Sequence, residues 1–310
     1  MRCSPVIFSK VDFSRFDALV ASDFLDLATL RGLAEHRLPT AVYMHENQIS
    51  YPSLTDDERD NHFKFNNITS CLAADKVWFN SDFHRQQFFD EAKKFISIFP
   101  KVGQSAWLEN IKCKSEVHYL GVELAPLPLS KPINKVPSIL WNHRWEHDKN
   151  PDEFLEVLRS LSAAGQAFEL ILCGQRFARK PEALNRIETE FAERIRFNGE
   201  ASKQDYWKLL ESSDFVFSTA NHEFFGISVV EALSKGCWPL LPRRLSYPEI
   251  ISDVFHSDVF YDTTADIVKL WEKALPQLAG RQNQWAEIAQ RFSWAERIGD
   301  FDRAIAAMIK

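Results

Sequence analysis

The segment "DFVFSTANHEFFGISVVEALSKGCWPLLPR" (residues 214–243) places two short β-rich runs on either side of a helical pattern. The runs cover 214–219 and 237–243, and the helix between them is expected to start near Gly226. A strand, a crossover helix and a second strand are the repeating unit of a parallel sheet. The segment therefore predicts a wound α/β domain.

The same alternation continues outside this segment. Further β-rich runs in the second half cover 138–144, 167–174 and 195–200. Helical patterns lie between them at 151–164, 181–193 and 202–212. The first half repeats the alternation more weakly, with β-rich runs at 16–22, 38–44, 75–81 and 115–123. Both halves are thus expected to form wound α/β sheets.

Two domains follow from this division of the chain. Residues 125–137 contain four prolines, which favour a stiff, extended connection without helix. We expect domains at 1–124 and 138–310, joined by this linker, and a C-terminal tail that is helical to its end and long enough to pack across both domains. The carboxyl ends of parallel strands bind ligands in such folds, so residues just beyond strand ends are the candidate site residues.

Composition narrows the function classes. The chain has 310 residues, of which 45% are hydrophobic and 26% charged, and it lacks an apolar run near the ~18 residues of a membrane span. Its start does not resemble a secretory signal, so a cytoplasmic protein is expected. Its histidines and cysteines form no ligand motif, so no metal is expected. A formal net charge of −6 argues against general nucleic-acid binding, although a local basic patch including Lys93, Lys94, Lys112 and Lys114 remains an alternative.

The loop and helix after residue 219 form the first candidate site. Backbone amides at a helix start, here those of Gly226 and Ile227, bind anions such as phosphate. Glu223 precedes the helix and Glu231 follows eight positions later. Carboxylates repel phosphate but accept hydrogen bonds from sugar hydroxyls, so the pattern indicates a nucleotide sugar. A capped helix with surface acids fits the same spacing.

Two further groups follow other strands. Arg144 ends the run at 138–144 and Lys149 comes five residues later, a pair of cations suited to a diphosphate. Ordinary surface charges are the alternative. In the first half, His45, Glu46, Asn47 and Gln48 follow the run at 38–44 and are expected to line the cleft from the other domain; a helix cap is the alternative.

Several motifs together resemble the family-four retaining glycosyltransferases of GT-B fold. The two glutamates separated by seven residues, the Arg and Lys pair, and "EALSKGCWPLLP" (231–242) carry this resemblance. More narrowly, the chain is similar to the tRNA-queuosine mannosyltransferase group. That similarity rests on "HENQISYP" (45–52), "NHRWEHDKNP" (142–151), "STANHEFFGISVVEA" (218–232) and "LSYPEI" (245–250).

The resemblance implies a fold and a reaction. The fold is two Rossmann-like domains facing a central cleft, and the reaction moves mannose, with retention, from GDP-mannose to queuosine in a tRNA anticodon. By position, Glu223 would contact the mannose, Glu231 would hold the ribose, and His45 would lie against the donor sugar. Arg144, Lys149 and the Gly226 and Ile227 amides would stabilise the diphosphate, with His222 also in the donor site. No metal or other cofactor is implied.

One departure from the family and two alternatives remain. Family members begin with an additional strand and a glycine-rich turn, whereas the first glycine here is Gly32. The N-terminal domain is therefore expected to lack its first strand. The alternatives are transfer from a nucleotide sugar to a lipid or glycan acceptor, and an inactive relative that only binds nucleotide or RNA.

Overall fold

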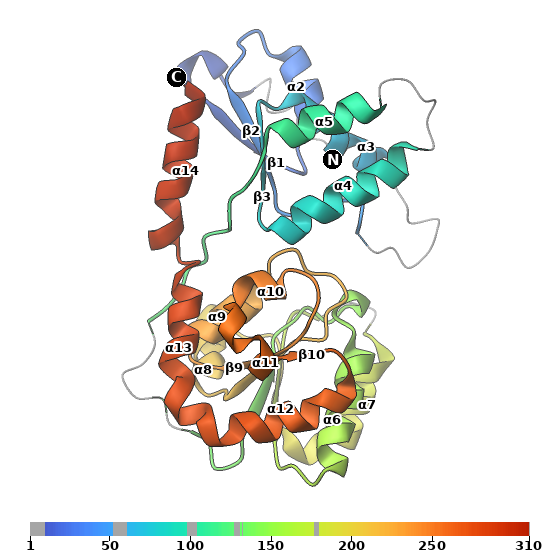
Figure 1. The fold of residues 1–310 in the computed structure, drawn as a ribbon, viewed down its shortest axis with the longest axis vertical. Helices are drawn as coiled ribbons and strands as arrows, with labels where there is room; N and C mark the ends of the chain where they lie inside the picture. The colour runs from blue at the N-terminus through green and yellow to red at the C-terminus, as the bar shows by residue number, and fades with distance from the viewer. Residues whose placement is uncertain are drawn as a thin grey trace. The chain divides into compact units, whose positions relative to one another are not determined.

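The computed structural model describes residues 10–51, 61–97, 104–126, 131, 133–176 and 180–309. The chain forms two compact units: unit 1 contains Met1–Leu120 and Arg297–Lys310, and unit 2 contains Gly121–Glu296. In each unit a parallel sheet is flanked by helices (Figure 1). Residues 127–130 and 132 of the expected linker, and residues 1–9, lie outside the described residues, and the expectation of a missing first strand stays a prediction.

The sheet of unit 1 has four parallel strands in sequential order, β1-β2-β3-β4. These strands are β1 (Leu19–Ser22), β2 (Thr40–Met44), β3 (Lys76–Phe79) and β4 (Ser115–Val117). The helices between them are α2 (Leu27–Leu33), α3 (Asn61–Ala73), α4 (Asp82–Ile96) and α5 (Gln104–Cys113). All four expected strands of the first half are therefore present, each shorter than its sequence pattern.

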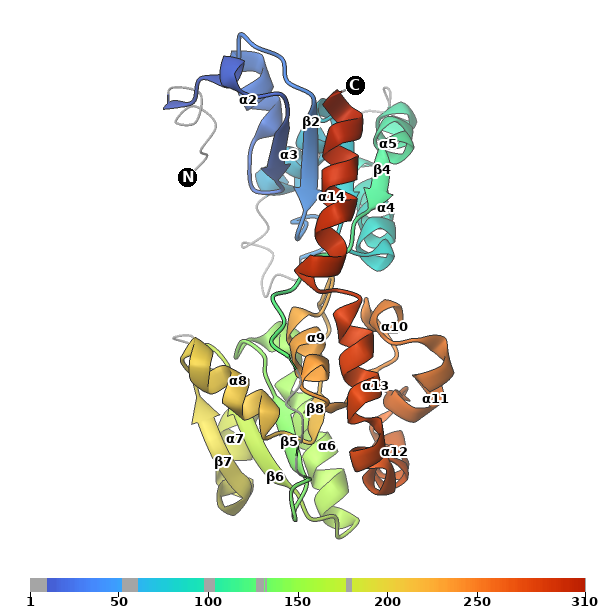
Figure 2. The same cartoon turned by 90° about the vertical axis from the view of Figure 1, so that its left-hand side faces the viewer.

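The two faces of this sheet are covered by different parts of the chain. One face carries a core that includes Val42, Val77 and Phe88. The other face buries Tyr43 and Trp78 beneath α14 (Trp294–Ile309), which runs alongside β2 (Figure 2). Residues 138–310 were all expected in the second domain, but the tail from Arg297 belongs to unit 1. The physical reason is that the aromatic face of β2 and β3 is buried by the apolar side of α14.

The sheet of unit 2 has six parallel strands in the order β10-β9-β8-β5-β6-β7. The strands are β5 (Ser138–Trp141), β6 (Glu169–Cys173), β7 (Ile195–Gly199), β8 (Phe215–Phe217), β9 (Trp238–Pro242) and β10 (Phe260–Tyr261). The two-residue β10 was not expected from the sequence, because it is too short to show a pattern. The other five strands lie where they were expected.

The helices of unit 2 match the expected patterns closely where they begin. Pro151 occupies the first turn of α6, and Ser202 caps α8 by accepting the backbone N–H of Asp205 at 3.1 Å. The helices are α6 (Pro151–Ala163), α7 (Glu182–Glu190), α8 (Lys203–Glu211), α9 (Ile227–Ser234), α10 (Tyr247–Ile250), α11 (His256–Val259), α12 (Ile267–Ala274) and α13 (Leu278–Gln290).

Strand order determines which loops of unit 2 meet. β5 is the first strand of the unit, and it pairs with β6 on one side and β8 on the other. The order of the strands therefore reverses between β5 and β8, and ligands of such sheets bind outside the strand ends at this point. The loops after β5 and β8 carry Arg144, Lys149, Glu223 and Gly226.

Candidate active site

Lys149 is the buried centre of the candidate site in unit 2. It ends a short 3-10 turn, His147–Lys149, and its side chain is 7% exposed. The ammonium group donates to the carbonyl of His222 at 2.8 Å and lies 3.1 Å from Asp148 Oδ2 and 3.5 Å from Glu223 Oε2. One cation thus joins the loop after β5 to the loop after β8.

The charges in this cluster support one another. Burial raises the pKa of Glu223, but the Lys149 ammonium, together with smaller contributions from His143, the Phe225 amide and His222, brings the pKa below its usual value. Burial likewise lowers the pKa of Lys149, yet Glu223 and Asp148 bring it above the usual value. Lys149 is therefore charged and Glu223 ionised at neutral pH.

Two histidines beside Lys149 are neutral. Burial, followed by the nearby Lys149 charge, lowers the pKa of His143 to about 4 and that of His222 to about 4. At neutral pH their imidazoles add no positive charge to the cluster. His222 joins the candidate site through its carbonyl, which accepts from Lys149.

Arg144 differs from Lys149 in its exposure. Its side chain is 42% exposed, and its guanidinium lies 3.2 Å from Glu146 Oε2. A partly exposed guanidinium on the same loop has the planar fork of N–H donors that suits the oxygens of a phosphate. The expected pair is therefore divided between a buried cation and an accessible one.

The start of α9 has a conformation that favours glycine. Gly226 precedes the helix with φ 98°, and a Cβ at this position would lie 3.0 Å from Ile250 Cδ1 and 3.2 Å from Tyr247 Cε1. Backbone conformation and packing against Tyr247 therefore require a glycine here, whatever its amide binds. Ser246 holds the preceding loop through the Phe225 carbonyl at 2.9 Å.

Glu231 is held by an aromatic hydroxyl. Tyr206 donates to Glu231 Oε2 at 2.6 Å, and Asn142 donates to the Tyr206 hydroxyl at 3.0 Å and to the Ser228 carbonyl at 2.9 Å. Burial raises the pKa of Glu231, and the Tyr206 hydrogen bond opposes this effect. Tyr206 and Asn142 also line a pocket of about 320 Å³, together with His143, Arg144, Cys173, Gly174, Gln175, Glu200 and Ala201.

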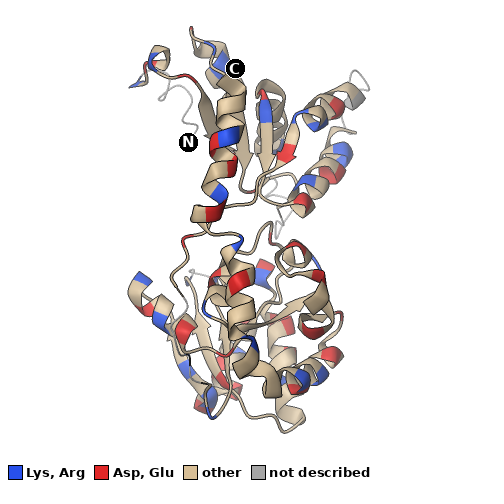
Figure 3. Cartoon of the chain, turned by 60° about the vertical axis from the view of Figure 1, so that its left-hand side comes forward, with Lys and Arg blue, Asp and Glu red and all other residues tan. Residues whose placement is uncertain are grey.

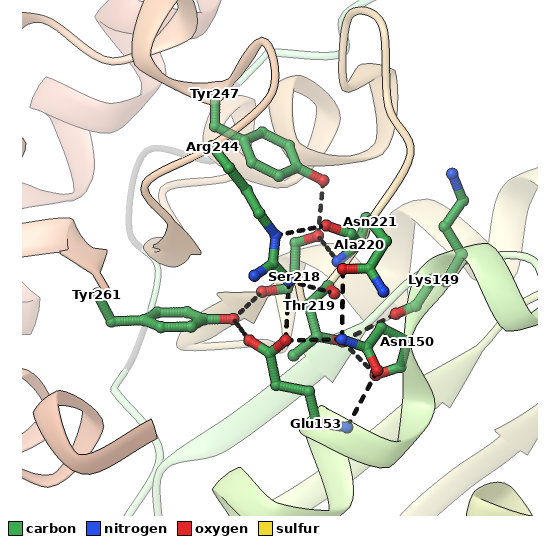
Figure 4. A network of polar contacts seen from close by, with 10 residues as sticks. All are labelled: Lys149, Asn150, Glu153, Ser218, Thr219, Ala220, Asn221, Arg244, Tyr247 and Tyr261. Atoms are coloured by element: carbon green, nitrogen blue, oxygen red, sulfur yellow. Dashed lines mark hydrogen bonds and ion pairs between the residues drawn. The ribbon is translucent and has the colours of Figure 1, made fainter. Parts of the chain in front are cut away.

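A hydrogen-bond network fixes the loop after β8 (Figure 4). Arg244 donates to the carbonyls of Thr219 at 2.8 Å and Ala220 at 3.0 Å, and pairs with Glu153 at 2.8 Å. Tyr261 donates to Glu153 at 3.0 Å and to the Ser218 carbonyl at 2.8 Å. The short β10 therefore has a function in the site, because it supplies Tyr261.

The same network connects this loop to the turn that carries Lys149. Thr219 donates its hydroxyl to the carbonyls of Lys149 at 2.9 Å and Asn150 at 3.0 Å, and the Asn221 amide donates to the Asp148 carbonyl at 2.8 Å. Asn150 adopts the left-handed conformation, with φ 51°, and its side chain caps α6. Hydrogen bonds to backbone carbonyls thus join the turn that carries Lys149 to the loop that carries Glu223.

The candidate residues of unit 1 follow β2. His45 is exposed, Glu46 and Gln48 are half-buried, and burial lowers the pKa of His45. The ring of His45 lies 4.6 Å from that of Tyr43, measured between centroids. Asn47 was expected to line a cleft, but this is wrong: its side chain is fully buried and accepts from the amide and hydroxyl of Ser50, both at 2.9 Å, closing a turn.

Two lysines of the alternative basic patch have partners within unit 1. Lys114 donates to the carbonyls of Leu72 at 2.8 Å and Ala74 at 2.6 Å, so it satisfies the end of α3 rather than facing solvent. Lys94 pairs with Glu91 at 2.6 Å. Figure 3 shows Lys and Arg interspersed with Asp and Glu along the helices of both units.

Comparison with known families and proteins decides the family. The family model "tRNA-queuosine alpha-mannosyltransferase N-terminal" matches residues 1–122, and "Glycosyl transferases group 1" matches residues 130–292. A tRNA-queuosine alpha-mannosyltransferase of Drosophila melanogaster is 35% identical over 266 residues, which cover 82% of this chain and 70% of that protein. The chain belongs to this glycosyltransferase family.

Other relatives are more distant. A GDP-mannose:cellobiosyl-diphosphopolyprenol alpha-mannosyltransferase of Xanthomonas campestris is 27% identical over 171 residues, covering 53% of this chain and 45% of that protein. The structure of HepE from Anabaena in complex with UDP has a TM-score of 0.72 at 14% identity, covering 98% of this chain and 82% of that one. These structural neighbours confirm the GT-B fold class.

Membership of a glycosyltransferase family supports an enzyme rather than a protein that only binds nucleotide or RNA. Within the residues that the structure describes, every helix is too short or too polar to traverse a bilayer.

The residues that position the site were harder to find from the sequence. The sequence analysis did not single out Asp148, Tyr206, Arg244 and Tyr261. The last three act through side chains far away in the chain, and the burial of Asp148 beside Lys149 depends on the tertiary structure. Ser246 and Tyr247 lie in "LSYPEI", a motif that supported the family resemblance but for which no structural role was predicted. The available sequence signal for such residues is a cation or an aromatic residue at the end of a strand near the point where the strand order reverses. Arg244 has this position, because it directly follows the run at 237–243.

Proposed function

We propose that this chain transfers mannose, with retention of configuration, from GDP-mannose to queuosine in a tRNA anticodon. The observation that supports this proposal most strongly is the 35% identity to the Drosophila tRNA-queuosine alpha-mannosyltransferase across 82% of the chain. A named GDP-mannose-dependent relative in Xanthomonas campestris supports the donor. A tRNA acceptor is consistent with the cytoplasmic location that we propose.

The donor would bind at the carboxyl ends of β5 and β8. Arg144 reaches the diphosphate with its exposed guanidinium, and the Gly226 and Ile227 amides meet the same group at the start of α9. Lys149 acts as a fixed charge, since its three N–H donors already face His222, Asp148 and Glu223. It lowers the cost of placing both a diphosphate and Glu223 in one site.

The remaining contacts concern the sugars. Glu223, ionised and 22% exposed, accepts hydrogen bonds from mannose hydroxyls near the reacting carbon. Glu231, together with the Tyr206 hydroxyl, holds the ribose at the rim of the 320 Å³ pocket. His222 contributes to the donor site through its carbonyl on Lys149, His45 lies against the donor sugar, and Glu46 and Gln48 lie on the acceptor side.

Catalysis in this proposal rests on stabilising the leaving diphosphate. As the bond from the sugar breaks, negative charge builds on the phosphate oxygens, where Arg144, Lys149 and the α9 amides are fixed in advance. These groups supply the neutralising charge, so we propose that no metal is needed. Transfer that survives dialysis against EDTA would support this point, and transfer restored only by Mg²⁺ would contradict it.

The test is a transfer assay with nucleoside mass analysis. Purified protein and queuosine-containing tRNA are incubated with GDP-mannose, UDP-glucose or UDP-N-acetylglucosamine. We expect a hexose gain on queuosine from GDP-mannose alone, lost by about 10²–10³-fold in Glu223→Gln, because the variant lacks the carboxylate that meets the sugar. Glu193→Gln, at an exposed position, is the matched control. No gain with any donor would contradict the proposal.

A second acceptor class has one observation in its favour. The Xanthomonas campestris relative is named for a diphosphopolyprenol-linked acceptor, so a lipid-linked glycan is the alternative. Replacing the tRNA with cellobiosyl-diphosphopolyprenol in the same assay separates the two. Mannose gain on the lipid and none on tRNA would favour the alternative.

A further inference from the structure

Asp23 is a buried carboxyl directly after β1, and no role has been assigned to it so far. It is 2% exposed. β1 and β2 pair in parallel, with Ser22 opposite Tyr43 as the last pair. Beyond that pair, Asp23 Oδ1 accepts the backbone N–H of His45 at 3.2 Å. The side chain of Asp23 therefore continues the pairing of β1 and β2 beyond the last residue pair. It holds the backbone that directly follows β2.

Two buried amides complete the frame around the segment His45–Gln48. Asn80, just after β3, donates from Nδ2 to the His45 carbonyl at 2.9 Å. Asn67 of α3 accepts the Gln48 amide at 2.8 Å and donates to the Asp23 carbonyl at 3.0 Å. The backbone of His45 is therefore held at its N–H by Asp23 and at its carbonyl by Asn80.

The arrangement of Asp23 differs from a simple helix cap or surface pair. Both carboxyl oxygens are removed from solvent, and Oδ2 has no hydrogen-bond partner among the described residues. Burying a carboxyl is costly and is normally offset by strong hydrogen bonds. Here its hydrogen bonds from backbone amides serve the segment that carries His45 and Glu46.

We propose that Asp23 is a positioning residue, which fixes the backbone of His45–Gln48 in the shape needed for the acceptor. The part of this inference that concerns the acceptor rests on the proposed function. The part that concerns the backbone of the segment does not. In this proposal Asp23 acts through His45 and Glu46, and it does not itself contact the reacting atoms.

The first experiment needs no substrate. Hydrogen–deuterium exchange is measured on the full chain for the wild type, Asp23→Asn and Asp26→Asn. A neutral amide oxygen accepts a hydrogen bond more weakly than a carboxylate does, so the His45 amide, which donates to Asp23 Oδ1, is expected to exchange about tenfold faster in Asp23→Asn. Asp26→Asn removes a carboxyl three residues away, and asparagine still caps α2, so exchange at 45–48 should not change.

The second experiment separates positioning from a general structural role. In the transfer assay, Asp23→Asn should raise the KM for tRNA or lower kcat by about tenfold, while the KM for GDP-mannose changes much less, because the proposed contacts of its diphosphate and ribose lie in unit 2. Asp26→Asn should match the wild type in all three constants.

The results distinguish the inference from the proposed function. Unchanged exchange at 45–48, or a uniform rise throughout unit 1, would overturn the inference. Faster exchange with unaltered tRNA kinetics would overturn the role in the reaction. A wild-type chain that transfers no mannose would overturn the proposed function, and exchange would still decide whether Asp23 holds the segment.

Discussion

Lys149 is the residue on which the electrostatics of unit 2 depend most. It is 7% exposed and neutralises Asp148, 1% exposed, and Glu223. Lys149→Met keeps much of the side-chain volume but leaves two buried carboxylates without a cation. We expect the free energy of unfolding at pH 7 to fall by about 3–5 kcal/mol, measured by urea denaturation.

The matched control for that substitution is Lys203→Met. Lys203 forms a surface pair with Glu123, and both side chains are more than 70% exposed. Surface pairs contribute about 0–1 kcal/mol, so this variant should unfold as the wild type does. Equal losses in the two variants would show that Lys149 is not a buried partner of the acids.

Asp23 gives unit 1 a pH dependence with a definite sign. Burial raises the pKa of this carboxyl from 3.8 to about 7, with the nearby Glu46 charge in the same direction and the His45 and Glu46 amides opposing it; the Cys71 thiol also faces it. The folded chain therefore binds more protons than the unfolded chain between pH 4 and 7. Stability contributed by Asp23 is present at low pH and is lost as pH rises through about 7.

The variant Asp23→Asn tests this sign, because asparagine has no charge to gain. The advantage of the wild type over Asp23→Asn in unfolding free energy should be larger at pH 5 than at pH 8, measured as urea midpoints in buffers of equal ionic strength. A difference between the two proteins that stays constant from pH 5 to pH 8 would contradict the raised pKa.

Among the elements, α9 depends on the conformation of the residue before it. Gly226 has φ 98°, and an added Cβ would lie 3.0 Å from Ile250. Gly226→Ala should therefore lower the free energy of unfolding by about 1–3 kcal/mol and impair donor binding, since the helix start moves. Gly280→Ala is the control, because Gly280 lies within α13 with no atom near the added Cβ and should stabilise the chain by about 0.5–1 kcal/mol. A tolerated Gly226→Ala would contradict the strain.

Elements also show how far sequence patterns extend. The strands at β5 and β8 and the start of α6 were predicted because hydrophobic runs, Pro151 and the loop residues between them are local signals. β10 has two residues and no pattern of its own, yet it supplies Tyr261 to the network around Glu153. Its existence depends on pairing with β9, which is a contact between segments and not a local property.

For the whole molecule, the C-terminal helix is the clearest case of a long-range contact. Phe301 of α14 lies 5.6 Å from Tyr43 and 6.1 Å from Trp78 between ring centroids. Phe301→Ala should lower the free energy of unfolding of unit 1 by about 2–4 kcal/mol, seen by calorimetry as a lower transition temperature. Asp302→Ala, at an exposed position of the same helix, is the control. Equal transitions for Phe301→Ala and the wild type would contradict this packing.

The sequence by itself determined the fold class, the order of the strands along the chain and the loops that carry Arg144, Lys149, Glu223 and His45. These features follow from local hydrophobic periodicity, turn residues and helix-start signals. Only the tertiary structure decided that Lys149 is buried between two acids, that Asn47 and Lys114 serve the backbone, and that the tail from Arg297 belongs to unit 1. Burial and hydrogen bonding involve residues that are far apart in the chain. Which residues become buried or bonded therefore depends on which strands become neighbours, and a local sequence pattern does not contain that information.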